Sequence, residues 1–153
     1  MVKLHGFALG GQTGAFNLYF DQEGSGLASL NKRRLDHLGV SMSDHIEVQV
    51  KTLDDWIKFE TLRPVVALKL DVEGSELAVL RGATETLGRL DVIQFEFGGT
   101  MIDSRTFFQD FWYLLSPHGF RIFRLTPLGL RLIPRYSELE ETFTFTNYVA
   151  IKD

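Results

Sequence analysis

The sequence contains no cysteine, and this absence excludes several kinds of site at once. A disulfide framework, a thiolate zinc site and a cysteine nucleophile all require the missing thiol. No apolar run approaches the roughly 18 residues of a membrane-spanning helix, and the first residues lack the apolar core of a secretory signal. We therefore expect a soluble, cytoplasmic protein with no membrane partner.

Basic charge is also scarce. The chain has 16 lysines and arginines against 20 acidic residues, for a net charge of −4 and no block of like charge. This balance argues against a nucleic-acid partner, which would favour a basic face. The four histidines show no metal-ligand spacing, and no G-x-S-x-G element supplies a hydrolase nucleophile, so we predict no metal site and no hydrolase.

The composition is that of a globular protein, with 44% hydrophobic residues in a chain of 153, and we expect a single domain over residues 1–153. Alternating apolar residues predict strands at 2–9, 15–20 and 46–51. Thr52 and Asp55 have nearly the spacing of a capping box, which predicts a short helix directly after the third of these strands.

The second half alternates between strand and helix patterns. We expect a helix from Ser75 or Gly74 to about residue 87, and a second from Asp103 or Ser104 to 116, with an apolar side that includes Phe107. The expected strands are 65–72, 92–96, 120–125, 130–133 and 142–151. This order predicts an α/β layered domain with parallel strands and an antiparallel last pair.

Gly82 lies inside the first of these helical patterns, at a cost of about 1 kcal/mol relative to alanine. Such a glycine suggests close packing of the helix against a strand.

Acidic residues stand where two neighbouring strands end. Asp71 and Glu73 follow the apolar run that starts at residue 65, and Glu96 ends the next strand. Because parallel strands direct their carboxyl ends to one edge of a sheet, which is the ligand edge, Asp71 and Glu96 should meet there. Asp71 could orient or deprotonate a hydroxyl, or it could simply cap a turn. We expect Lys69 to form a structural ion pair with a nearby carboxylate such as Glu96.

The segment LKLDVEGSE at 68–76, followed by VLRGA at 79–83, resembles the hallmark of FkbM-type methyltransferases. VKTLD at 50–54, IQFE at 93–96, NYVA at 147–150 and ALG at 8–10 are similar to other segments of that family, in the same order. The resemblance spans nearly the whole chain. Its most specific block lies between Lys69 and Ala83.

This resemblance implies a Rossmann-like class I fold, with strand order 3-2-1-4-5-7-6 and an antiparallel final strand. It also implies transfer of a methyl group from S-adenosylmethionine to oxygen on a small-molecule acceptor, a sugar or natural product. The matching positions make Asp71, Glu73 and Glu96 the candidate catalytic residues, and Ala8, Leu9 and Asp71 the candidate cofactor-binding residues.

The chain departs from the family at its start. The glycine-rich turn D-x-G-A-N-x-G of the family's first strand is missing, and so is the acid that ends its second strand. We therefore expect a sheet that lacks its first two strands, in a truncated product, a fragment or a shortened homologue, and weak or no binding of the cofactor. The exposed sheet edges predict a homo-oligomer, or an amino-terminal part that joins the sheet in another way. The alternative function is a catalytically silent α/β interaction module.

Overall fold

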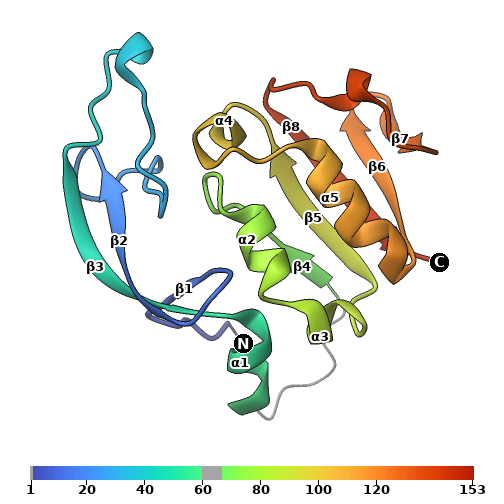
Figure 1. The fold of residues 1–153 in the computed structure, drawn as a ribbon, viewed down its shortest axis with the longest axis horizontal. Helices are drawn as coiled ribbons and strands as arrows, with labels where there is room; N and C mark the ends of the chain where they lie inside the picture. The colour runs from blue at the N-terminus through green and yellow to red at the C-terminus, as the bar shows by residue number, and fades with distance from the viewer. Residues whose placement is uncertain (1, 60–66) are drawn as a thin grey trace.

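The computed structural model describes residues 2–59 and 67–153, which form two β-sheets with helices packed beside them (Figure 1). The smaller sheet has the strand order β1-β3-β2, and its strands are β1 (Ala8–Leu9), β2 (Gly14–Phe20) and β3 (Asp44–Lys51). The larger sheet has the order β4-β5-β8-β6-β7, and its strands are β4 (Ala67–Lys69), β5 (Val92–Phe97), β6 (Phe120–Thr126), β7 (Gly129–Ile133) and β8 (Thr146–Lys152).

Strand directions in the larger sheet follow the pattern expected for the second half of the chain. β4 and β5 are parallel, and β8 lies antiparallel between β5 and β6. β6 therefore runs in the same direction as β4 and β5, and β7 folds back on it as a hairpin. The prediction of an α/β fold with parallel strands and an antiparallel final strand is confirmed for this sheet.

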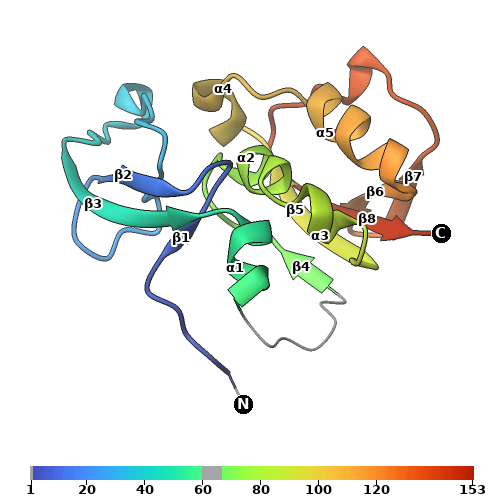
Figure 2. The same cartoon turned by 60° about the horizontal axis from the view of Figure 1, so that its bottom comes forward.

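Helices cover one face of the larger sheet. Figure 2 shows α2, α3 and α5 on the same side of it. The helices are α1 (Leu53–Phe59), α2 (Glu76–Arg81), α3 (Thr84–Leu87), α4 (Thr100–Ser104) and α5 (Phe108–Leu115), with single 3-10 turns η1 (Asp36–Leu38), η2 (Ser116–His118) and η3 (Glu138–Glu140). No helix in the described ranges is long and apolar enough to cross a membrane.

Aromatic side chains fill the layer between β5 and α5. Phe95 stacks on Phe111 with ring centroids 4.6 Å apart, and Phe97 meets Phe108 edge to face. All four rings are fully buried, and they belong to the core cluster that also contains Tyr148 of β8. The phenylalanines of the second half thus serve mainly as core residues, where each contributes a large apolar area.

Several expected element boundaries were wrong. In the stretch 2–9 only β1 is a strand. The central strand expected at 65–72 is observed at Ala67–Lys69, and its first two positions lie outside the described residues. The terminal strand begins at Thr146 instead of 142.

The two long helices expected in the second half are each divided into two. At the first break, the Gly82 carbonyl accepts the Asp54 N–H at 3.1 Å, and the Asp54 carboxylate accepts the backbone N–H groups of Glu85 and Thr86. Asp54 therefore caps α3 from a distant position in the sequence. At the second break, Glu141 accepts the N–H groups of Phe108 and Gln109, so α5 starts there.

Phe107 was expected on the apolar side of this second helix. It instead precedes α5 and is half exposed, and its N–H bonds to the Asp110 carboxylate at 2.9 Å.

The prediction for Gly82 is confirmed. A Cβ atom placed on this residue would lie 2.4 Å from the carbonyl oxygen of Gly10, just after β1, and 3.2 Å from Cβ of Thr52, just after β3. The end of α2 thus packs directly on the backbone of the smaller sheet. The smaller sheet does not join the larger one. In the smaller sheet β1 pairs with β3, and the outer strands of the larger sheet are β4 and β7.

We predict that Gly82→Ala lowers the free energy of unfolding by about 1–3 kcal/mol, because the new methyl group meets a backbone oxygen that cannot rotate away. Gly88→Ala is the matched control, since its Cβ would meet nothing closer than 3.4 Å and its φ of −60° suits alanine. The control should be neutral or stabilising by up to about 1 kcal/mol. Urea unfolding of both variants checks this, and equal effects would refute the close packing.

Candidate functional site

The turn between β4 and α2 is built around one buried carboxylate. Glu76 is 1% exposed, and its two oxygens accept the N–H of Val72 at 3.1 Å and the N–H of Gly74 at 3.0 Å. Burial raises the pKa of Glu76, although these hydrogen bonds act in the opposite direction. This side chain turns back and shapes the loop before its own helix.

This turn needs an unusual backbone. Glu73 and Gly74 have φ values of 48° and 96°, both in the left-handed region. Glycine is required at 74, because a Cβ there would lie 2.8 Å from the carbonyl oxygen of Thr100, and left-handed φ values are unfavourable for other residues. Strain of this kind is often found at functional sites.

Asp71 lies at the exposed end of β4, and its Oδ2 accepts a hydrogen bond from Lys69 Nζ at 2.6 Å. The expected structural ion pair of Lys69 with a nearby carboxylate therefore forms, and its partner is Asp71 rather than Glu96. Positions 69 and 71 are two residues apart, which places their side chains on the same side of an extended chain. Both side chains are about 60% exposed, so this ion pair adds little to stability.

Glu73 is held by a segment that the sequence did not single out. Arg33 Nη1 donates to Glu73 Oε2 at 2.8 Å, and the hydroxyl of Ser29 donates to the Glu73 carbonyl at 2.7 Å. Burial raises the pKa of Glu73, and the guanidinium of Arg33 opposes this effect. The Glu73 carboxylate is thus committed to an ion pair.

Glu96, at the end of β5, is the carboxylate best suited to act as a base. It is only 7% exposed, and within the described residues no side chain or backbone N–H donates a hydrogen bond to its carboxylate. Burial raises its pKa to about 7, and the nearby charges of Glu73, Glu76 and Asp71 add to the shift. The sheet edge thus brings Asp71 and Glu96 into one acidic cluster, which we call the acid tip (Asp71, Glu73, Glu76 and Glu96).

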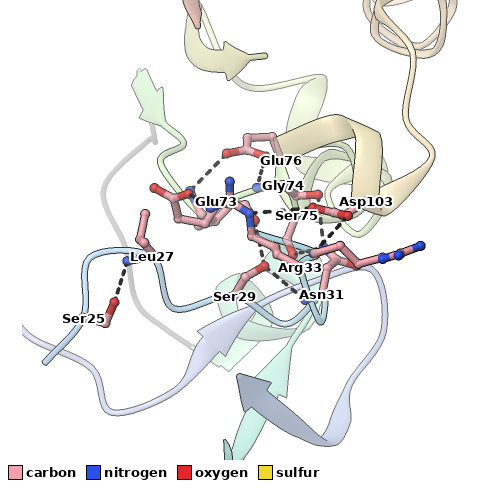
Figure 3. Close-up of polar contacts among 12 residues, drawn as sticks. Ser25, Leu27, Ser29, Asn31, Arg33, Glu73, Gly74, Ser75, Glu76 and Asp103 are labelled. Atoms are coloured by element: carbon pink, nitrogen blue, oxygen red, sulfur yellow. Dashed lines mark hydrogen bonds and ion pairs between the residues drawn. The ribbon is translucent and has the colours of Figure 1, made fainter. Parts of the chain in front are cut away.

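Residues 29–34, which we call the strap, lie across the turn (Figure 3). Asn31 Nδ2 donates to the Gly74 carbonyl and to the Ser75 hydroxyl, both at 3.2 Å. The Arg34 N–H donates to Asp103 Oδ1, and Arg33 Nε lies 3.9 Å from Asp103 Oδ2, so the strap also reaches α4. Apart from the polarity of its residues, nothing in the sequence predicted the strap. Its hydrogen-bond partners in the turn and in α4 are about 40 or more positions away in the sequence.

The two amino-terminal candidates lie apart from the acid tip. Ala8 and Leu9 pair with Val50 and Lys51 of β3. A cavity of about 380 Å³ lies between the smaller sheet and α2, and its wall includes Gly10, Phe16, Asn31, Ser75 and Ala78. Ala8, Leu9 and Asp71 do not line this cavity. The predicted cofactor residues are thus not gathered around it.

The residues present suit only one part of S-adenosylmethionine. The carboxylates of the acid tip match the positive charge of its sulfonium group. The sequence has no glycine-rich turn to approach the rest of the molecule. In the described part of the chain, no three or more histidine, aspartate or glutamate side chains are placed to hold a metal ion.

The sequence matches the methyltransferase FkbM domain over residues 2–122. This range extends from before β1 into β6 and includes the strap, the turn after β4 and all four residues of the acid tip. Searches against curated proteins and against solved structures found no significant match.

We predict that Glu76→Gln lowers the free energy of unfolding by about 1–3 kcal/mol at pH 7, because an amide cannot accept both backbone hydrogen bonds. Glu85→Gln is the matched control, since Glu85 also lies in the first turn of its helix but is exposed. Its effect should stay within about 0.5 kcal/mol. Urea denaturation measures both values, and a tolerated Glu76→Gln would exclude a structural role for this carboxylate.

Glu96 should make the fold less stable as the pH rises. Because its pKa is raised in the folded state, the folded protein holds the Glu96 proton more tightly, and this contribution is lost between about pH 4.5 and 7. The stability of Glu96→Gln relative to the wild type should therefore increase from pH 5 to pH 8, by at least about 1 kcal/mol.

Urea unfolding at the two pH values measures this difference. The control is Glu47→Gln, at an exposed position of β3. A wild-type minus Glu96→Gln difference that stays constant between pH 5 and pH 8 would contradict the raised pKa.

Proposed function

We propose that this chain, which belongs to the methyltransferase FkbM domain family, transfers a methyl group from S-adenosylmethionine to a hydroxyl oxygen of a small molecule. Glu96 is the observation that carries the proposal. This buried carboxylate has a pKa of about 7 and, in the described part of the chain, no hydrogen-bond donor. It is therefore partly ionised at neutral pH, and it binds a proton more tightly than an ordinary glutamate.

When bound, the cofactor supplies an electrophilic methyl group on a sulfonium ion. In the proposed reaction Glu96 would accept the proton that the acceptor hydroxyl loses when its oxygen takes the methyl group. Glu76 fixes the backbone of the turn beside the acceptor. A positioned base of this kind contributes about 10²–10⁴ to the rate.

The fold supports this proposal in its second half. The order β4-β5-β8-β6 corresponds to the order of strands four, five, seven and six in a class I methyltransferase. We propose that the acceptor is a sugar or natural product that approaches the acid tip. Because the sequence lacks the glycine-rich turn, we propose that the cofactor binds weakly. The cytoplasmic location stays a prediction.

The alternative, a catalytically silent interaction module, is favoured by the strap. Arg33 neutralises Glu73, while Asn31 and Ser29 occupy main-chain carbonyl groups of the turn. In this alternative the acid tip is a structural joint, and the outer strands β4 and β7 offer unpaired edges to a second copy of the chain.

We predict slow transfer of a labelled methyl group to hydroxyl acceptors at millimolar S-adenosylmethionine, with a rate that rises as the pH passes 7. Glu96→Gln should lower the rate about 10²- to 10⁴-fold, because it removes the base. Lys69→Met is the control, because Lys69 lies at the same edge and its ion-pair partner among the described residues is exposed Asp71, and its rate should change less than tenfold.

The control measurements separate the two functions. A folded chain that gives no transfer to a panel of sugars and polyols, and that sediments as a dimer, supports the silent module. Calorimetric titration should give a dissociation constant for S-adenosylmethionine well above the micromolar range. Micromolar affinity would contradict weak cofactor binding.

A further inference from the structure

A surface hollow beside the strap concentrates positive charge in a chain that is acidic overall. This basic hollow has a volume of about 510 Å³, and its charged lining residues are Lys32, Arg34, Asp36, Asp103 and Arg105. The cations come from two distant segments, the strap and the end of α4. The chain has a net charge of −4, so such a gathering runs against its average charge.

The acidic residues of the basic hollow are largely used by other groups. Asp103 accepts the Arg34 N–H at 3.2 Å and faces the buried guanidinium of Arg33 at 3.9 Å, so its charge is already compensated from within the protein. Arg33 itself points inward and is 9% exposed. Of the two acidic residues that line the hollow, Asp36 is therefore the one that can balance the charge of the outward-facing cations.

The three outward cations have little other use. Among the residues that the structure describes, neither Arg34 nor Arg105 forms a side-chain ion pair, and Lys32 Nζ only lies 5.8 Å from the centroid of the Tyr19 ring. All three side chains belong to exposed residues. Holding like charges around one hollow is unfavourable, and an anion would relieve the repulsion.

The backbone at Arg105 gives an independent observation. This residue ends α4 with a φ of 55°, in the left-handed conformation. Glycine or asparagine is usual at such a position, and a long side chain there carries a conformational cost. An arginine in this place directs a cation to the hollow at the expense of local backbone energy.

We propose that the basic hollow binds a phosphorylated ligand through Lys32, Arg34 and Arg105. A phosphate carries up to two negative charges and several acceptor oxygens, which match the forked donors of two guanidinium groups and one ammonium. A simple carboxylate would leave part of this charge unmatched. In the strap, Lys32 and Arg34 flank Arg33, the residue that pairs with Glu73 of the acid tip.

Identifying this ligand as the methyl acceptor rests on the proposed function, whereas the phosphate site itself does not. In that case the acceptor would carry both a free hydroxyl and a phosphate, as a sugar phosphate does.

Titration of the full chain with pyrophosphate, followed by NMR at low salt, tests the site. We expect saturable shifts at Arg34 and Arg105, and at least tenfold weaker binding in the double variant Arg34→Ala/Arg105→Ala. The matched control is Arg89→Ala/Arg135→Ala, which removes the same charge from exposed positions elsewhere and should bind as the wild type does. Lys32→Ala is a second test variant, and it should bind pyrophosphate at least threefold more weakly than the wild type.

Three outcomes would overturn the proposal: no saturable binding, equal weakening in the control double variant, or binding of succinate as tight as that of pyrophosphate. Glucose 1-phosphate separates the two levels of the argument. If it binds through the same arginines but is never methylated, the phosphate site stands and the identification of its ligand as the methyl acceptor fails.

Discussion

The arrangement of the acid tip depends on one buried carboxylate. Glu76 accepts two backbone N–H groups of the turn that precedes its own helix, and in this way it fixes the left-handed backbone at Glu73 and Gly74. That backbone fits against the carbonyl of Thr100 with no room for a side chain at 74. This turn therefore fixes β4, α2 and α4 relative to one another. It also positions the side chains at the ends of the strands.

Four carboxylates at one sheet edge repel each other, and the protein distributes its cations unevenly among them. Asp71 has Lys69, Glu73 has Arg33, and Glu76 has two backbone N–H groups. Glu96 has no such partner in the described part of the chain, so burial and the charges of its neighbours act on it together. Among these four carboxylates the largest rise in pKa is therefore that of Glu96, and this is the reason for proposing Glu96 as the base.

Sequence patterns predicted the elements whose signals are local. Alternation located β3 and β5, and the rule that parallel strands end at one edge brought Asp71 and Glu96 together. The breaks in the two long helices could not be predicted, since the groups that cap α3 and α5 are Asp54 and Glu141, about 30 positions away. The strap was missed for the same reason.

Helix α2 is held at both ends by the amino-terminal part of the chain. Its last turn packs on the Gly10 carbonyl through Gly82, and the turn before it is bound by Ser29 and Asn31 of the strap. The strap also carries Arg33, whose partner Glu73 is the strongest neighbouring charge acting on Glu96. A ligand in the proposed phosphate site would contact Lys32 and Arg34, the neighbours of Arg33 in this strap. A ligand that displaced Arg33 from Glu73 would therefore also change the charge next to Glu96, and through it the proton affinity of the proposed base.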